Sequence, residues 1–164
     1  MTKSDAKNVR ALWIKQEQGE LEIDKKTSYG TDIFFLVKDG AKLIAAGRLQ
    51  KQNVEFRSKT YAILGIADIA SKVKGAGHGR ILMTSIRNYL ADNKKTGVGF
   101  CAENNAGFYR KIGIKVNRQL ISRFYSKLEG KETGDDVVIY FEKGCELIKD
   151  MRNHKGVAQI AWFW

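Results

Sequence analysis

The sequence contains no proline, and cysteine and histidine occur only twice each in 164 residues. Without proline, turns and helix ends must be formed by glycine, asparagine and aspartate. Cys101 and Cys145 are far apart and form no Cys-x-x-Cys pair, and His78 and His154 are not clustered with them. This distribution argues against a disulfide scaffold and against a metal centre, so we expect two reduced, packed thiols and no metal.

Long hydrophobic runs are also missing. No apolar stretch approaches the roughly 18 residues that a membrane span needs, and the segment 1–10 lacks the apolar core of a secretory signal. We therefore expect a soluble, cytoplasmic protein without membrane contact. Because the chain shows no repeat, linker or low-complexity segment, residues 1–164 are predicted to form a single domain, as a monomer or a homodimer.

The formal net charge of +11 favours anionic partners such as nucleotides or nucleic acid. The lysines are spread along the whole chain, which favours a solvated basic surface with one local anion site. A nucleic-acid-binding module stays open as an alternative, because aromatic and cationic residues are interleaved in "SRFYSK", residues 122–127.

The first half of the chain reads as a helix followed by three strands. An apolar stripe at helical spacing predicts an N-terminal helix that stops near Gly19. The residues at this spacing are Val9, Leu12 and Trp13, followed by the polar Gln16. Residues 31–49 read as two strands joined by the hairpin turn Asp39-Gly40. Residues 60–70 are almost wholly apolar and predict a central strand that is buried on both faces.

The second half alternates helices and strands. A helix is expected after the glycine cluster that ends at Gly79, with its exit at Lys94-Lys95 and Gly97. A short helix is expected at 104–113, capped by Asn104 or Asn105 and ended by Gly113. Further elements are expected as strands at 97–102, 119–128, 135–144 and 158–164 and a helix at about 143–153. The order predicts an α/β (α+β) fold in which helices flank a mixed sheet.

Three glycines, Gly75, Gly77 and Gly79, fall within five positions between the predicted central strand and the next helix. Glycines let backbone N–H groups approach a ligand, and a helix N-terminus attracts phosphate, so the cluster is either a phosphate cradle or a structural loop. It is not a P-loop, because no Lys-Ser or Lys-Thr follows, and its spacing differs from the dinucleotide fingerprint.

A second motif follows about 30 residues later. The loop "KGAGHG" (Lys74 to Gly79) and the segment "FYRKIGI" (Phe108 to Ile114) together resemble the GCN5-related N-acetyltransferases, the GNAT superfamily. The resemblance covers residues 60–115 and implies a mixed, mostly antiparallel sheet with a splayed strand pair and flanking helices. It also implies an acetyl-CoA-dependent N-acetyltransferase, in which a primary amine attacks the thioester directly.

The resemblance implies two sets of coenzyme A contacts. The central strand would hold the pantetheine arm through Ala67, Asp68 and Ile69. The backbone of the loop would bind the pyrophosphate through Lys74, Gly75, Ala76, Gly77, His78, Gly79 and Arg80. Acetyl-CoA is then a co-substrate and no metal is implied. The side chain of His78, at a variable position of the loop, is expected to face solvent.

Tyr109 stands where the family commonly places the acid that protonates the departing thiolate, and the resemblance favours this role. The alternative is an aromatic on the core face of a short helix. For the base, Asp68 is the leading candidate, because a desolvated carboxylate in an apolar strand would have a raised pKa. The alternative for Asp68 is an ion pair with a lysine or arginine. Glu103 and a water chain are further candidates for the base.

The acceptor is open between a small-molecule amine and a peptide amine. The terminal "IAWFW" has a weak resemblance to aminoglycoside 2′-N-acetyltransferases, which would place Trp164 at the acceptor pocket. The alternative for these aromatics is a packed strand edge. A coenzyme A-binding GNAT fold without catalysis is also open, because no base is obvious.

Overall fold

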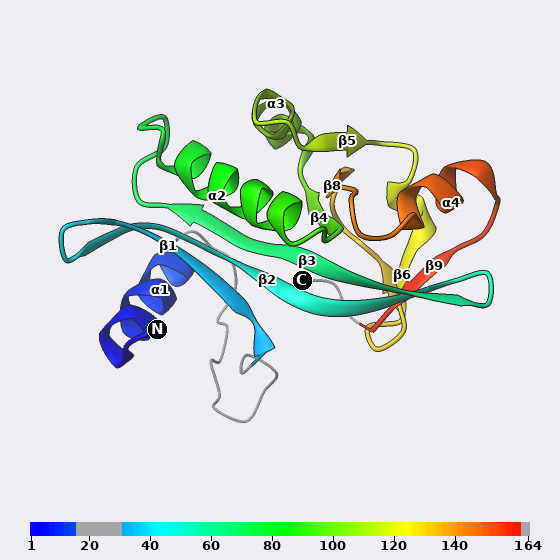
Figure 1. The fold of residues 1–164 in the computed structure, drawn as a ribbon, viewed down its shortest axis with the longest axis horizontal. Helices are drawn as coiled ribbons and strands as arrows, with labels where there is room; N and C mark the ends of the chain where they lie inside the picture. Colours follow the sequence, from blue (N-terminus) through cyan, green and yellow to red (C-terminus); the bar gives the residue numbers. More distant parts are fainter. Residues whose placement is uncertain (16–30, 162–164) are drawn as a thin grey trace. The chain divides into compact units, whose positions relative to one another are not determined.

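The computed structural model describes residues 1–15 and 31–161, which contain four α-helices and nine strands (Figure 1). The helices are α1 (Lys3–Lys15), α2 (His78–Asp92), α3 (Glu103–Lys111) and α4 (Leu147–Asn153). The strands are β1 (Ile33–Asp39), β2 (Lys42–Phe56), β3 (Lys59–Ser71), β4 (Gly97–Cys101), β5 (Lys115–Asn117), β6 (Phe124–Ser126), β7 (Lys131–Glu132), β8 (Val137–Phe141) and β9 (Ala158–Ile160). None of the helices in this part of the chain is long and apolar enough to cross a membrane.

The strands follow one another in the hydrogen-bonded order β5-β8-β4-β3-β2-β9-β6-β7, and β1 pairs with β2. Pairing is parallel in β3–β4 and β6–β9, and antiparallel in β1–β2, β2–β9, β4–β8, β5–β8 and β6–β7. The β3–β4 ladder contains two residue pairs, Leu64↔Gly97 and Gly65↔Val98. The predicted mixed, mostly antiparallel sheet with flanking helices is therefore confirmed.

The chain forms two compact units, and strands β2 and β3 run through both. The first unit comprises residues 1–50 and 66–86, and the second comprises residues 51–65 and 87–164.

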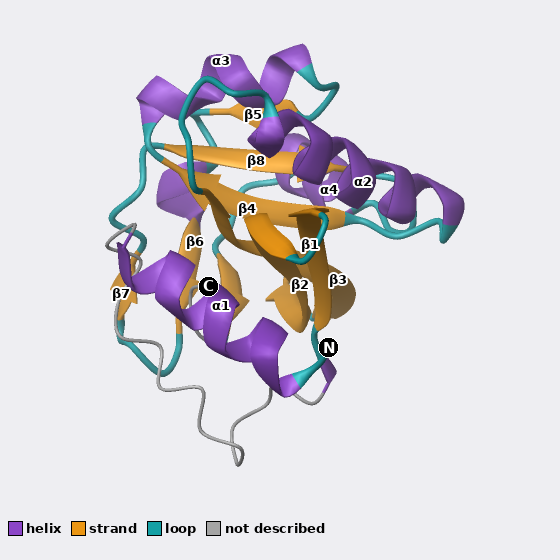
Figure 2. Ribbon diagram, turned by 90° about the vertical axis from the view of Figure 1, so that its left-hand side faces the viewer, coloured by secondary structure: helices purple, strands orange, loops and turns teal. Residues whose placement is uncertain are grey.

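In the first unit, helices cover both faces of the strands. Val9, Leu12 and Trp13 of α1 pack into a buried cluster with Ala46 of β2 and Ala70 of β3. The neighbouring position in β2, Gly47, points to the other face, because successive strand residues alternate. A Cβ at Gly47 would meet Ile69, Leu82 and Ile86. Helices α1 and α2 accordingly lie on opposite sides of the strands (Figures 1 and 2).

The second unit has its own hydrophobic core. Phe56 and Ile63 from β2 and β3, Phe124 from β6, and Leu147 and Met151 from α4 are buried together in it. Helix α3 lies against β5 and β8. This unit supplies the second sequence motif, because α3 contains most of the segment 108–114.

Several local predictions are confirmed. Gly40 has a φ of +55° between β1 and β2, as the Asp-Gly hairpin requires, and residues 63–67 of β3 are buried. Helix α2 begins at His78, within the glycine cluster and one residue before Gly79, and Gly113, with a φ of +77°, follows the end of α3. Gln16 and Gly19 of the predicted N-terminal helix lie outside the described residues, as do Trp162 to Trp164.

Other local predictions were wrong. Helix α2 ends before Lys94-Lys95, and Gly97 is the first residue of β4 rather than the helix exit. The expected strand 119–128 is a 3₁₀ turn at Ile121–Arg123 followed by the short β6. Strands β5 and β7 were not expected. The turn between β2 and β3 was also missed, because Arg57 and Ser58 carry positive φ angles that glycine or asparagine usually signals.

The capping of α3 by Asn104 or Asn105 is also incorrect. The helix begins at Glu103, one residue before Asn104, and the N-cap residue Ala102 makes no side-chain cap. Instead, the carboxylate of Asp136 accepts a hydrogen bond of 2.8 Å from the Glu103 N–H. An acceptor 33 residues away in sequence thus replaces the local cap.

Gly144→Ala should destabilise the second unit. A Cβ at this position would lie 2.3 Å from the Lys94 carbonyl oxygen, and backbone atoms cannot swing aside as a side-chain end can. We expect a loss of about 1–3 kcal/mol in the free energy of unfolding. Gly134→Ala is the matched control, because a Cβ there meets nothing within 4 Å. Urea unfolding checks the pair, and equal stability of the two variants would contradict the backbone contact.

Candidate active site

The glycine loop joins the end of β3 at Ser71 to the start of α2 at His78. Gly75 has a φ of +82° and Gly77 a φ of +80°, a region that L side chains rarely adopt. A Cβ on either residue would meet nothing within 4 Å. Both positions therefore need glycine for their backbone conformation, and the open space beside them leaves their peptide groups accessible.

Backbone donors remain available where the loop enters the helix. The Arg80 and Ile81 N–H groups both donate to the Gly77 carbonyl, at 3.0 and 3.2 Å. The preceding N–H groups, of His78 and Gly79, make no hydrogen bond with the described part of the chain. Helix α2 has no acidic residue in its first turn, so nothing there offsets the positive end of its dipole. This helix start suits an anion.

A cavity of about 640 Å³ opens beside this loop within the first unit. Its lining combines three lysines and one carboxylate, Asp39, with apolar side chains and His78. Val73 and Ile81 are exposed large hydrophobic residues. A surface that combines apolar contacts with cations suits a ligand that has both a flat apolar part and phosphate groups.

His78 differs from its expected solvent-facing orientation. The residue is half-buried, and its Nδ1 atom is buried without a hydrogen-bond partner in the described structure. The side chain also lines the cavity beside the loop. The sequence missed this because a position in a glycine-rich loop gives no signal of what packs over it.

Asp68, the leading candidate for the base, lies in β3 in a buried ionic cluster. Its Oδ2 accepts a hydrogen bond from Arg48 Nε, and Arg48 Nη1 donates to Asp32 Oδ2. The side chains of Arg48, Asp32 and Asp68 are 5%, 1% and 12% exposed. Burial raises the pKa of Asp32, against the opposing effect of Arg48. Of the two interpretations given for Asp68, the ion pair is present.

The backbone of Asp68 is unusual for a strand. Its φ is +52°, in the left-handed region. Its carbonyl oxygen accepts a hydrogen bond of 2.8 Å from the indole Nε1 of Trp13, in α1. Trp13 is 1% exposed and stacks on Phe34 of β1, with ring centroids 6.2 Å apart. Ala67 and Ile69 flank this residue in the same strand.

Tyr109 lies in α3, in the second unit, and is 7% exposed. Burial raises the pKa of its phenol, and the nearby Cys101 and Asp135 raise it further. The hydroxyl is therefore protonated at neutral pH, as an acid must be. Its ring meets that of Phe108 edge to face, with centroids 5.1 Å apart.

Glu103, the weaker candidate for the base, is held by an exposed arginine. Arg118 Nε donates to Glu103 Oε2 at 2.6 Å, and Arg118 Nη2 donates to the other oxygen. The hydrogen bonds from Arg118 lower the pKa of Glu103. A carboxylate with a lowered pKa is a weaker base, so this arrangement speaks against Glu103 in that role.

The predicted site residues are divided between the two units. Asp68 with its strand neighbours, and the loop from Lys74 to Arg80, belong to the first unit. Tyr109 belongs to the second unit. Trp164, the proposed acceptor contact, lies outside the described residues.

The sequence did not indicate three residues that surround Asp68 or its backbone. Arg48 and Asp32 had no motif around them, and Trp13 was noticed only as part of an apolar helical stripe. Arg48 did carry one signal in the sequence, because it is the charged residue near the end of the apolar run 43–49 of a predicted strand. A charged side chain that is buried in such a strand needs an ion-pair or hydrogen-bond partner.

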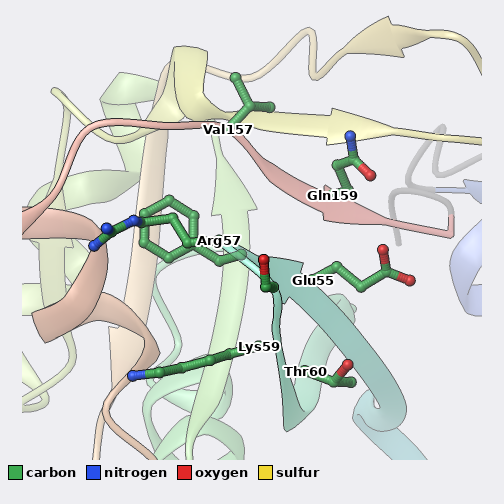
Figure 3. Close-up of a pocket in the computed structure, with 8 residues that line it drawn as sticks. Glu55, Arg57, Lys59, Thr60, Val157 and Gln159 are labelled. Carbon is green, nitrogen blue, oxygen red and sulfur yellow. The ribbon is translucent and has the colours of Figure 1, made fainter.

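A second cavity, of about 330 Å³, lies in the second unit at the turn between β2 and β3. Figure 3 shows its polar lining, with Glu55 and Gln159 from the paired strands β2 and β9, and Arg57 and Lys59 at the turn. None of the predicted site residues lines it.

No protein-family model matches the sequence, and no curated protein matches it. Solved structures do match, in 110 chains. A GNAT family N-acetyltransferase (YhbS) from Escherichia coli, solved in complex with CoA, has a TM-score of 0.61 and 14% identity over 97% of this chain and 86% of its own. An acyl-CoA N-acyltransferase from Pseudomonas aeruginosa has a TM-score of 0.58 and 14% identity over 85% of this chain and 90% of its own.

A third match is a conserved protein from Enterococcus faecalis, titled a probable N-acyltransferase, with a TM-score of 0.57 and 20% identity. It aligns with 70% of this chain, which spans only 31% of that protein. At these identities the matches establish the fold, and the chain has the fold of the GNAT N-acetyltransferases. They give no support to the aminoglycoside 2′-N-acetyltransferase subgroup.

Cys101 should be nearly inert toward thiol reagents in the folded protein. Burial, and then the negative charges of Asp135 and Glu103, raise the pKa of its thiol to about 12, so its thiolate is scarce at pH 8. In a Cys145→Ser variant, we expect Cys101 to react with a disulfide reagent at least about 100-fold more slowly than in denaturant. Equal rates in the folded and unfolded chains would contradict the buried environment.

Proposed function

We propose that this protein is an acyl-CoA-dependent N-acyltransferase that transfers an acetyl group from acetyl-CoA to a primary amine. The observation that carries the proposal is the junction of the glycine loop with α2. There, positive φ angles at Gly75 and Gly77 precede the unbonded N–H groups of His78 and Gly79. Similarity to the fold of a GNAT protein solved with CoA supports the same assignment.

The loop and its surroundings fit coenzyme A chemically. A pyrophosphate needs backbone donors, a helix N-terminus and cations, and the loop offers the first two with Lys74 and Arg80 beside them. The adjacent cavity adds Lys42 and Lys72 together with exposed apolar side chains. We assign this cavity to the nucleotide end of the donor.

The reaction moves one acyl group. The neutral amine forms a C–N bond to the thioester carbon and the C–S bond breaks. The nitrogen loses one proton to the base or to solvent, and the departing thiolate takes one proton from the acid. We propose that Tyr109 donates that proton, because it stands at the motif position of the acid. Its raised pKa keeps the phenol protonated at neutral pH and makes it a weaker acid than a free tyrosine. Asp68 remains our candidate for the base. Its 12% exposure leaves part of the carboxyl accessible, although Arg48 binds Oδ2.

The acceptor belongs to the class of primary amines, of a small molecule or of a peptide. An acyltransferase that takes the neutral amine must remove a proton from an ammonium ion first, so acidic groups near the acceptor would help. A GNAT fold that binds coenzyme A without catalysis is the second candidate, favoured by the engagement of Asp68 with Arg48.

Gly77→Ala should weaken acetyl-CoA binding by about tenfold or more, because the added Cβ disfavours the φ of +80° that turns the loop. Gly130→Ala is the matched control. It also removes a glycine with positive φ, +64°, but at an exposed position between β6 and β7. Isothermal titration with acetyl-CoA measures both. The expected result is weaker binding in the first variant only.

Wild-type protein should be stabilised by acetyl-CoA through binding linkage, which a melting curve detects. The absence of any shift at about millimolar ligand would remove the basis of the proposed function. A panel of amines that includes polyamines, aminoglycosides and peptides, read out by free thiol release, identifies the acceptor class. Binding without turnover on every amine would favour the catalytically inactive alternative.

Tyr109→Phe should lower turnover by about 10²- to 10⁴-fold while acetyl-CoA affinity stays within about twofold. The phenylalanine keeps the buried ring and removes only the hydroxyl. Because the raised pKa keeps the phenol protonated, wild-type turnover should show no decline from Tyr109 ionisation up to about pH 10. Unchanged turnover in the variant would end the acid role of Tyr109.

A further inference from the structure

We propose that Trp13 and Arg48 are positioning residues that hold Asp68 in a left-handed backbone conformation, and thereby direct the peptide groups of Ala67–Ile69 toward the acyl-CoA donor. The inference rests on the proposed function, which assigns these strand residues to the pantetheine arm. It adds a role for the Asp68 backbone that is separate from the chemistry of its carboxylate.

The starting observation is a strand residue whose backbone departs from the extended conformation. Asp68 has a φ of +52° near the end of β3, where extended residues have φ near −120°. Aspartate tolerates this region better than most L residues, but it is still disfavoured unless the surroundings hold it. Such a residue rotates the peptide planes on either side of it, so the neighbouring N–H and C=O groups point away from a regular ladder.

Trp13 holds the main chain at this point. Its indole N–H donates to the Asp68 carbonyl at 2.8 Å, across 55 residues of sequence. The indole has little freedom to move, because it is 1% exposed and stacks on Phe34. Trp13 is a donor only, so the carbonyl must stay turned toward α1 for the hydrogen bond to exist.

Arg48 holds the side chain of the same residue. Its planar guanidinium donates through Nε to Asp68 and through Nη1 to Asp32, and it is 5% exposed. Asp32 is 1% exposed, and its second oxygen, Oδ1, has no hydrogen-bond partner in the described structure. Within the described residues, both carboxylates are neutralised by the same buried cation, Arg48.

Carbonyl and carboxylate of Asp68 are thus anchored independently, by α1 and by β2. With both ends fixed, the residue cannot relax to a negative φ without breaking a buried hydrogen bond or a buried ion pair. Helix α1 thereby shapes the proposed donor site through its hydrogen bond to β3. The proposal gives the indole N–H of Trp13 a role that a purely apolar ring at this position could not fill.

The first experiment separates the hydrogen bond from the packing of α1. Trp13→Phe keeps an aromatic ring against Phe34 and removes the N–H donor. Val9→Ala loosens the same helix in the same buried cluster without touching Asp68. We expect the dissociation constant of coenzyme A to rise about tenfold in Trp13→Phe and to stay within about twofold in Val9→Ala. Urea unfolding of both variants shows that the affinity does not simply follow stability.

The second experiment tests the backbone directly with Asp68→Ala, Asp68→Asn and Asp68→Gly. If conformation matters, coenzyme A affinity follows tolerance of positive φ, so the alanine variant binds weakest, by about tenfold relative to the glycine variant. If Asp68 acts only through its carboxylate, all three variants bind coenzyme A alike and differ from wild type in turnover alone. Because alanine and glycine both lack the carboxylate, their comparison isolates the backbone.

The outcomes distinguish the two levels of the proposal. Wild-type protein that does not bind coenzyme A contradicts the proposed function itself. Wild-type binding, with Trp13→Phe and Asp68→Ala both at wild-type affinity, overturns the positioning role and leaves the proposed function intact. If Trp13→Phe does not fold, the comparison of Asp68→Ala with Asp68→Gly decides the question.

Discussion

The buried guanidinium of Arg48 is the constraint on which the first unit depends. A charge that is 5% exposed has lost its hydration, so its neighbours must replace the lost water contacts. Asp32, just before β1, and Asp68, in β3, do so from either side of β2. One side chain therefore links three segments that a hydrophobic core alone would leave free to slide, because apolar contacts are not directional.

Asp68, one member of this ionic cluster, lies in the same stretch of chain as the glycine loop. Asp68 precedes Gly75 by seven residues, and the segment between them contains the end of β3 and the lysines beside the loop. A strand fixed at Asp68 gives the loop a fixed start. At its other end, Leu82 and Ile86 of α2 pack close over Gly47 of β2. Backbone donors that are already held in place lose little conformational entropy when they bind an anion.

The pKa values of Tyr109 and Cys101, in the second unit, are set by burial rather than by charge pairing. Tyr109 and Cys101 are both largely removed from water, and the pKa values of both groups are raised. Acidic groups nearby reinforce this effect, because a negative charge disfavours formation of a second one. The unit therefore keeps the Tyr109 phenol of α3 and the nearby Cys101 thiol of β4 protonated. Asp136 caps the first turn of α3.

Features encoded within a few residues could be predicted. The Asp39-Gly40 turn, the positive φ angles at Gly75 and Gly77, and the start of α2 follow from local backbone preferences, which act over a few residues in sequence. Sequence reasoning missed the turn between β2 and β3, because Arg57 and Ser58 adopt positive φ without the residue types that signal it. The missed cap of α3 is a different case, since its acceptor is supplied from outside the helix.

By itself, the sequence determined the glycine loop between β3 and α2 and the order of most strands and helices, though not β5 and β7, because glycine conformation and apolar periodicity are local properties. The tertiary structure alone decided the state of Asp68. From sequence, this aspartate could be a free base or one partner of an ion pair. Its residue type also gave no indication of its left-handed backbone conformation. Trp13 and Arg48 settle its environment from 55 and 20 residues away, and contacts over such separations exist only once the chain has folded.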